Sequence, residues 1–281
     1  MPLNEHQKTE IKKLLRDTLK EKIKKYARES PSLPFLETII RDPSQIAAYS
    51  FTHSIATTLG QSIFEKVAKI VAEPHFEIVK TQYTIKGKIS PKVGSLISNI
   101  LLEYKNETRK PDKEREIAEI LEIKSTTGTS TDSRVDLYLK RGDNEFYLEI
   151  KTAKPNIDVF KESKAKLLKW VALSKKPVIT IIAIPYNPYP HKYDRFTIQG
   201  ILDIKRELLV AEDFWKFLNN GDPGTYKDVL NLFDEVGREY HADIQSKIKS
   251  IAESKIDGFK IGEKSAKYAV KISRQTNIEK E

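Results

Sequence analysis

Residues 134–151 read RVDLYLKRGDNEFYLEIK and carry the clearest structural signal in the chain. Apolar and polar side chains alternate on both sides of a central RGDN, and this period of two is typical of β-strands. Gly142-Asp143 is a favoured two-residue turn between two such strands. The pattern predicts an antiparallel hairpin in which Arg141 faces Asn144 and, further along, Asp136 faces Glu149.

This register places two carboxylates opposite each other on one face of the hairpin. The Cβ atoms of Asp136 and Glu149 are expected roughly 4.5–5.5 Å apart, a repulsive arrangement that needs a compensating cation. A divalent metal takes oxygen ligands at roughly 2.0–2.6 Å, so both carboxylates can reach one ion. Lys151 follows on the same face, one pleat further along. Together the three side chains suit metal-assisted hydrolysis of a phosphodiester. The alternative is three ordinary charges on a solvated hairpin face.

The elements around the hairpin favour a position inside a sheet. A helix is expected from about Val159 to Leu173, followed by a β-branched strand from Val178 to Ile184. A strand–strand–helix–strand core with helices before and after it predicts a mixed α/β fold. Helices are also expected over residues 5–28, 44–72, 91–102, 113–124, 211–219 and 224–252, strands near 76–89, 196–202 and 268–272, and a polar loop over 125–133. We expect a single domain over residues 1–281, with a mainly helical part (1–110), a catalytic sheet core (111–205) and a helical C-terminal part (206–281).

Composition excludes several classes of protein. The 281 residues contain 49 Lys and Arg, 40 Asp and Glu, and no Cys, which excludes disulfide frameworks, thiolate zinc sites and cysteine nucleophiles. The opening MPLNEHQKTE lacks a hydrophobic signal region, and no run is long enough to span a bilayer, so we expect a cytoplasmic protein without a membrane partner. The scarcity of Cys and Met fits a thermophile.

The net charge of +9 favours a polyanionic partner, and most of it is local. Residues 150–176 hold eight Lys against Asp158 and Glu162, next to the proposed site. Such a run is often only a solvated helix face. Here it lies where the backbone of double-stranded DNA has to approach.

Asp136, a short turn and then Glu149-Ile150-Lys151 resemble the PD-(D/E)xK nuclease motif. The hairpin, EIKTAKPN (149–156), the helix after it and the downstream strand most resemble type II restriction endonucleases of that superfamily. GQSIFEKVAKI (60–70) resembles the N-terminal helix that often brings a glutamate into such sites. EDFWKFLNNGDPGTYKDVLNLFDEVG (212–237) is similar to the closing segment of several of these enzymes. The layout is most similar to the TdeIII-type group, which implies an interrupted GGNCC-like target.

The resemblance implies a restriction-endonuclease-like mixed β-sheet flanked by helices and a role for each site residue. Asp136, Glu149 and the backbone carbonyl of Ile150 would bind Mg²⁺, and Lys151 would position or deprotonate the attacking water. Glu65 would be an outer-shell or second-metal carboxylate, or else an ordinary solvent-facing helix residue.

The motif in this chain departs from the family pattern at one position, because Val135 stands where the motif has Pro. A literal copy occurs elsewhere, Pro111-Asp112 followed by Glu122-Ile123-Lys124. That stretch is predicted to be helical, and positions two apart in a helix point about 200° apart. Glu122 and Lys124 therefore cannot share a face, and we reject this copy.

Five further residues are candidate DNA contacts. They are basic or amide side chains after the motif, in the following helix, or in the aromatic loop 186–196: Lys154, Asn156, Lys164, Lys192 and Arg195. The predicted function is a Mg²⁺-dependent type II endonuclease acting as a homodimer on double-stranded DNA, because two strands need two sites related by a two-fold axis. The resemblance also implies a cognate methyltransferase. Two alternatives stay open: a repair or junction-resolving nuclease of the same superfamily, and a DNA-binding protein without catalysis.

Overall fold

The computed structural model describes residues 2–26, 34–124, 127–152, 157–189, 193 and 200–253. The chain divides into two compact units. The first, which contains the sheet, comprises Met1–Lys12 and Leu59–Leu232, and the second comprises Lys13–Thr58 and Phe233–Glu281. The single domain expected from the sequence stays a prediction.

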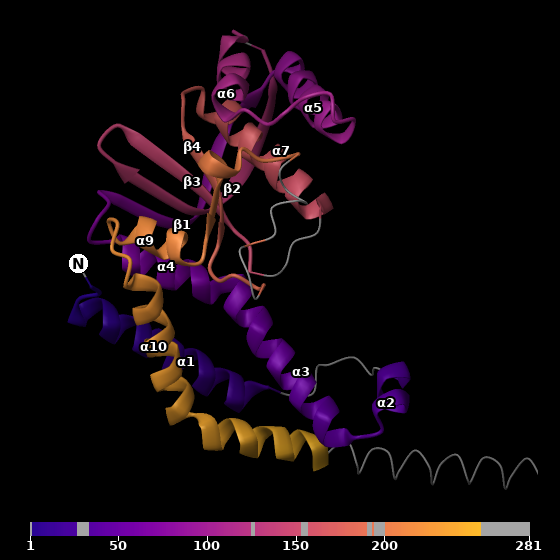
Figure 1. Cartoon of the computed structure of the whole chain (residues 1–281), viewed down its shortest axis with the longest axis vertical. Coiled ribbons are helices and arrows are strands. Elements are labelled where there is room, and N and C mark those ends of the chain that lie inside the picture. Colours follow the sequence, from indigo (N-terminus) through magenta and orange to yellow (C-terminus); the bar gives the residue numbers. More distant parts are fainter. Residues whose placement is uncertain are drawn as a thin grey trace, which may run out of the picture. The chain divides into compact units, whose positions relative to one another are not determined.

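The sheet-bearing unit holds a five-stranded mixed sheet of order β1-β2-β3-β4-β5 (Figure 1). The strands are β1 (Ile78–Ile89), β2 (Thr129–Arg141), β3 (Asn144–Ile150), β4 (Ile179–Ile184) and β5 (Leu208–Val210). β2 pairs antiparallel with both β1 and β3, whereas β3, β4 and β5 run parallel. Because helices flank this sheet, the predicted mixed α/β class is confirmed.

Helix α7 (Ile157–Ser174) packs against β1, β2, β3 and β4 and supplies much of the core. Its inward side chains include Phe160, Leu167 and Trp170, each at most 1% exposed. Two capped helices pack on α7. Ser90 accepts the amide of Val93 at the start of α5 (Pro91–Lys105), and Asp112 accepts that of Arg115 at the start of α6 (Lys113–Glu122).

Four further helices of this unit lie before β1 and around β5. They are η1, a π-helix (Leu59–Ile63), α4 (Phe64–Ala72), α8 (Ile204–Glu207) and α9 (Glu212–Leu218). α4 packs against β1, β2 and α9, and α9 packs against β5. Helix α4 therefore supports the strand pair that carries Asp136.

The second unit has its own small core. Its elements are the parts of α1 (Glu5–Lys25) and α10 (Thr225–Glu239) within its bounds, with α2 (Pro34–Ile40) and α3 (Pro43–Thr58). Residues 241–253 are also helical. Ala47, Phe51, Ile251 and Ala252 form a buried apolar cluster, and Arg16 makes a bidentate ion pair with Glu239 at 2.7 Å.

Three expectations about single elements differ from the structure. The expected loop 125–133 is strand from Thr129 onward, because β2 continues along β1 as far as the pair Ile89–Thr129. The expected helix 44–72 is divided by the π-helix. The strand expected at 196–202 is not seen in its described part, since Gly200 and Ile201 form a turn and Leu202 is coil, and a strand forms at β5 instead. Residues 196–199 and the strand expected at 268–272 lie outside the described residues.

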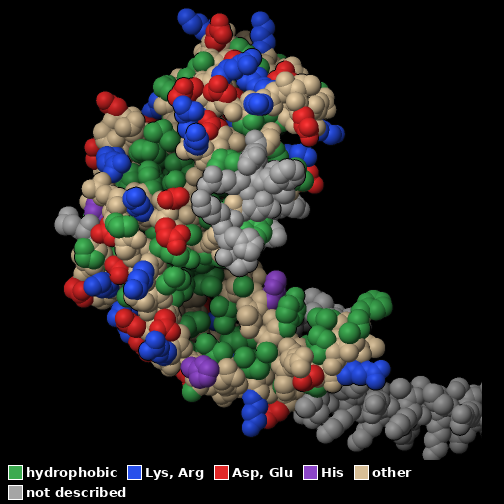
Figure 2. All heavy atoms as spheres, in the orientation of Figure 1, with side chains coloured by type: hydrophobic (Ala, Val, Ile, Leu, Met, Phe, Trp, Pro, Cys, Tyr) green, Lys and Arg blue, Asp and Glu red, His purple; other side chains and the backbone are tan. Residues whose placement is uncertain are grey.

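On the face shown in Figure 2, Lys and Arg lie interspersed with Asp and Glu over α5 and α6. In the part of the chain that the structure describes, no helix combines the length and the hydropathy needed to cross a membrane.

Candidate active site

The hairpin of β2 and β3 forms in the predicted register. Arg141 pairs with Asn144 and Leu137 with Leu148, so the next facing positions are Asp136 and Glu149. Gly142 has a φ of +58°, a left-handed conformation that glycine adopts without strain. Alternation and turn together therefore bring the two carboxylates to the same end of the hairpin.

Asp136 is held against β3 and largely removed from water. Its Oδ2 accepts a hydrogen bond from the backbone N–H of Ile150 at 2.8 Å, and its side chain is 17% exposed. Burial raises the pKa of Asp136, while the nearby Lys166 and the Ile150 hydrogen bond oppose that rise. The carboxylate is thus positioned but incompletely compensated, as expected of a ligand that needs a cation.

Glu149 shows the strongest sign of a missing partner. The residue is 3% exposed, its Oε1 lies 2.6 Å from Lys151 Nζ, and its Oε2 is buried without a hydrogen-bond partner. An orphaned carboxylate oxygen is costly in a protein interior and is rare without a functional reason. A hard divalent cation such as Mg²⁺ matches this donor set of two carboxylates and an adjacent backbone carbonyl.

Glu65 also lies near this pair, from helix α4. It is 8% exposed, so it is not the solvent-facing residue that was the alternative. Burial raises the pKa of Glu65, and Asp136 adds to that rise. Among the described residues, however, no three His, Cys, Asp or Glu side chains form a metal cluster, so the structure does not bring Glu65 in as a third ligand.

Gln82 on β1 connects Glu65 with the strand that carries Asp136, and the sequence analysis missed it. Its Nε2 donates to Glu65 Oε2 at 2.5 Å. Its φ of +53° is unusual for a non-glycine residue inside a strand. Thr81 pairs with Leu137 and Tyr83 with Val135, but the pair between them, Gln82 with Asp136, is absent from the ladder. Strained backbone of this kind is often found at functional sites.

Two lysines of α7 have roles that sequence reasoning did not separate. Lys166 lies 3.5 Å from Glu149 Oε1 and 3.9 Å from Asp136 Oδ1 and was missed as a site residue. Lys164, predicted to contact DNA, is fully buried and pairs with Glu116 and Glu207 at 2.5 and 2.6 Å. That prediction is corrected, because an ammonium enclosed by two carboxylates cannot reach a phosphate.

Helix geometry explains why Lys166 reaches the two carboxylates and Lys164 does not. Positions two apart in a helix point in nearly opposite directions, so only one of Lys164 and Lys166 can face the hairpin. The Lys166–Trp170 spacing of four residues, which places an ammonium over an aromatic ring, was the available signal. The four other predicted DNA contacts lie outside the described residues: Lys154, Asn156, Lys192 and Arg195.

The literal motif copy is helical only as far as Glu122, because Ile123 and Lys124 lie beyond the end of α6. Asp112 caps α6 by accepting the amide of Arg115 at 3.1 Å, and Glu122 is the last residue of that helix. These residues serve helix formation, and the hairpin is the only one of the two copies with facing carboxylates.

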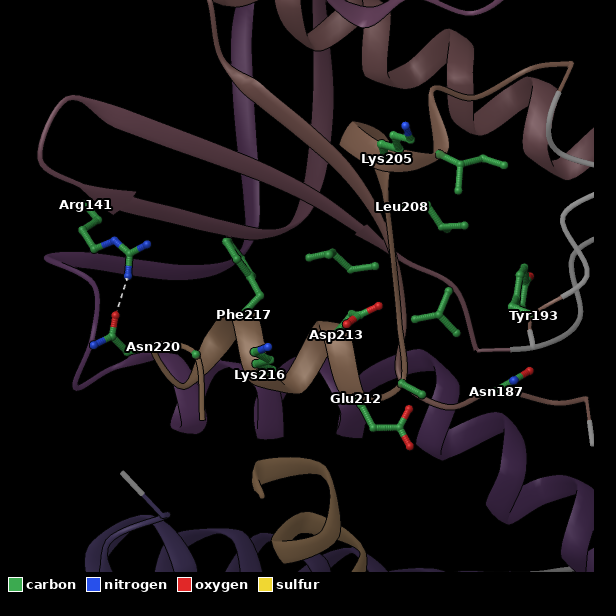
Figure 3. Close-up of a pocket in the computed structure, with 15 residues that line it drawn as sticks. Arg141, Asn187, Tyr193, Lys205, Leu208, Glu212, Asp213, Lys216, Phe217 and Asn220 are labelled. Atoms are coloured by element: carbon green, nitrogen blue, oxygen red, sulfur yellow. Dashed lines mark hydrogen bonds between the residues drawn. The ribbon is translucent and has the colours of Figure 1, made fainter. Parts of the chain in front are cut away.

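A separate pocket of about 880 Å³ lies around β5 and α9 (Figure 3). Arg141, Lys205, Lys216, Glu212 and Asp213 are among its lining residues. Arg141 reaches across the pocket wall to Asn220 at 3.2 Å. None of the candidate metal ligands lines this pocket, so it is distinct from the carboxylate site.

Comparison with known proteins gives consistent results. The family model "Type II restriction endonuclease, HinfI" matches residues 3–237. The chain is 30% identical over 206 residues to the type II restriction enzyme MjaII of Methanocaldococcus jannaschii, covering 66% of this chain and 54% of that protein. It is 30% identical over 229 residues to the type II restriction enzyme HgiCII of Herpetosiphon aurantiacus, covering 76% of this chain and 81% of the relative.

HgiEI, another type II restriction enzyme of that organism, is 28% identical over 228 residues. The chain thus spans about half the length of MjaII and about four fifths of the Herpetosiphon enzymes. The predicted likeness to type II restriction endonucleases is confirmed, although the matching family is not the TdeIII-type group that the layout suggested.

Proposed function

Because this chain belongs to the HinfI family of type II restriction endonucleases, we propose that it cuts double-stranded DNA at one short sequence with the help of Mg²⁺. The observation that carries the proposal is the buried, unpartnered Oε2 of Glu149 beside Asp136. In this assignment Asp136, Glu149 and the carbonyl oxygen of Ile150 would hold the ion. When bound, Mg²⁺ supplies Lewis-acid stabilisation of the phosphate and lowers the pKa of a water molecule.

The side chains of this chain perform the remaining tasks. Lys151, 2.6 Å from Glu149 Oε1, orients the attacking water or stabilises negative charge that develops on the phosphate oxygens. The Ile150 amide keeps Asp136 turned toward the site through its hydrogen bond at 2.8 Å. Glu65 acts from the outer shell, held by Gln82. The products would carry 5′-phosphate and 3′-hydroxyl ends.

Binding of DNA is assigned to the segment that follows the motif in the sequence and to the aromatic loop 186–196. Lys154, Asn156, Lys192 and Arg195 are the proposed contacts, and the net charge of +9 favours approach of the duplex. A homodimer supplies one site for each strand. A cognate methyltransferase protects the same sequence in a cytoplasmic restriction–modification system, and a GGNCC-like target stays a prediction.

Digestion of a plasmid of known sequence with Mg²⁺ tests the proposal. Discrete fragments with a common sequence at their ends are expected from the wild-type chain. Glu149→Gln should slow cleavage on the order of 10²–10³-fold, because it removes one charged ligand. Glu145→Gln is the matched control on the same strand, since Glu145 pairs with Lys176 and lies outside the site.

Three results would contradict the proposal. Undiminished cleavage by Glu149→Gln would exclude the assigned site, and absence of cleavage with every divalent ion would favour a DNA-binding protein. Cutting only at junctions or lesions would favour the structure-specific nuclease. Sedimentation of the protein with a DNA duplex tests the dimer separately.

A further inference from the structure

A second lysine, carried by a different element from Lys151, lies over the candidate metal ligands. Lys166 Nζ on α7 is 3.5 Å from Glu149 Oε1 and 3.9 Å from Asp136 Oδ1. Lys151 Nζ, from the end of β3, is 2.6 Å from the same Glu149 oxygen. Two ammonium groups thus balance two carboxylates, and both leave Glu149 Oε2 without a partner.

Lys166 has an anchor that does not depend on the carboxylates. Its ammonium lies 5.2 Å from the centre of the Trp170 ring, a distance at which a cation is attracted by the aromatic face. Trp170 is fully buried and donates from Nε1 to Ser133 Oγ at 3.0 Å, so the ring is fixed. The Lys166 side chain is 28% exposed, so it is accessible from solvent, whereas that of Lys164 is fully buried.

The net charge of the site indicates why it needs two lysines. Asp136, Glu149, Lys151 and Lys166 sum to zero, and Glu65 with the nearby Arg134 adds one charge of each sign. A divalent ion therefore makes the site doubly positive. A phosphodiester carries one negative charge, and its pentacovalent transition state carries two, so both ammoniums are needed to match it. Without Lys166 the loaded site would be one charge short.

We propose that Lys166 is a second catalytic cation, which neutralises Asp136 and Glu149 before metal binding and contacts the scissile phosphate afterwards. This inference rests on the proposed nuclease function. It assigns one lysine two opposite effects: its charge competes with the metal for the carboxylates, and the same charge stabilises the transition state. A lysine that only supported the fold would show neither effect specifically.

The test uses Lys166→Met, which keeps the length of the side chain and removes its charge. Binding of Mn²⁺ in the absence of DNA, measured by calorimetry, should become about tenfold tighter, the change expected when a positive charge roughly 5 Å from a divalent ion is removed in a water-like medium. Single-turnover cleavage at saturating Mg²⁺ should fall on the order of 10²-fold, the loss typical of one electrostatic contact to the transition state.

Two further variants make the result specific. Lys166→Arg keeps the charge, so its Mn²⁺ affinity should stay near that of the wild type and part of the cleavage rate should return. Lys69→Met, on α4, removes one exposed lysine that pairs with Glu73 at 3.4 Å, and it should change neither quantity. Thermal unfolding of each variant confirms that the compared proteins are folded.

Weaker Mn²⁺ binding by Lys166→Met, or an unchanged single-turnover rate, would overturn the role of Lys166. The proposed function is judged separately, because it stands if the wild-type chain cuts DNA at discrete sites and Glu149→Gln cuts it far more slowly. In that case a failure of the Lys166 prediction concerns only this lysine.

Discussion

Replacement of Lys164 by Met should destabilise the fold strongly, although Lys164 belongs to the basic segment next to the site. Lys164 Nζ lies 2.5 Å from Glu116 Oε2 and 2.6 Å from Glu207 Oε2, and all three side chains are at most 1% exposed. Met fills the space but leaves both carboxylates without this counter-ion. Breaking a buried ion pair typically costs about 3–5 kcal/mol.

Neighbouring groups limit, but do not remove, this cost. Lys113 is also buried, and burial lowers its pKa to about 8, so it is a weakened source of compensating charge. Burial raises the pKa of Glu207, whereas Lys164 and, less strongly, Lys113 lower it, so the loss of Lys164 removes the larger of the two compensating charges. With roughly 2–4 °C of melting temperature per kcal/mol in a chain of this size, the expected loss is about 6–20 °C.

Thermal unfolding followed by circular dichroism at pH 7.5 measures this loss. Lys161→Met is the control on the same helix, because Lys161 forms an exposed pair with Asp158 at 3.3 Å worth about 0–1 kcal/mol. The reasoning is refuted if Lys164→Met melts like the control while its DNA affinity falls and the salt dependence of binding decreases by about one phosphate contact, since that would make Lys164 a DNA contact.

Three other substitutions test the surroundings of the carboxylates. Burial raises the pKa of Asp136, so the ionised carboxylate destabilises the fold at a pH above this raised pKa. Asp136→Asn should therefore melt at a higher temperature than the wild type at pH 8. This difference should disappear as the pH falls to the pKa of an aspartate in the unfolded chain, and the variant should not cut DNA. Gln82→Gly relieves a left-handed φ of +53° but removes the hydrogen bond to Glu65, so stability should change by less than about 1 kcal/mol while cleavage falls about 10–100-fold. Gly60→Ala places a Cβ 2.6 Å from Thr152 Oγ1 and should slow cleavage on the order of 10²-fold by displacing the segment after the motif.

Each of these has an outcome that contradicts it. A melting temperature of Asp136→Asn that does not vary with pH relative to the wild type would show that burial does not perturb this carboxyl. A large loss of stability in Gln82→Gly would make the residue structural. Adding Thr152→Ala to Gly60→Ala should restore cleavage, because the next contact is the Thr152 Cβ at 3.5 Å, and Gly94→Ala, with no atom within 4 Å, is the control.

Local pattern was sufficient to predict the hairpin. The side-chain period of two and the turn at Gly142-Asp143 determine which residues face each other, so the neighbouring positions of Asp136 and Glu149 followed from residues 134–151 alone. Local pattern also predicted the helix between the two halves of the literal motif copy, Lys113–Glu122, although the structure ends this helix before Ile123 and Lys124. Both conclusions depend on interactions between residues close in sequence.

Contacts between distant elements were not predictable in this way. β5 has three residues, too few to show a period, and it forms because β4 offers an open parallel edge. Gln82 belongs to a strand more than 50 residues before Asp136, and its unusual φ occurs where the β1–β2 ladder lacks a pair and its side chain bonds Glu65. The local sequence pattern therefore predicts neither the position of β5 nor the conformation of Gln82.

The sequence alone determined that the two carboxylates and the lysine of the motif lie on one face of a hairpin, and that the fold is mixed α/β. It could do so because side-chain alternation and turn formation depend on only a few neighbouring residues. Tertiary packing decided which lysine of α7 is buried with Glu116 and Glu207 and which reaches Asp136 and Glu149. The physical reason is the orientation of α7 about its own axis, which is set by the packing of its whole apolar face on the sheet. This orientation decides which of the two lysines points into the core and which points toward the hairpin.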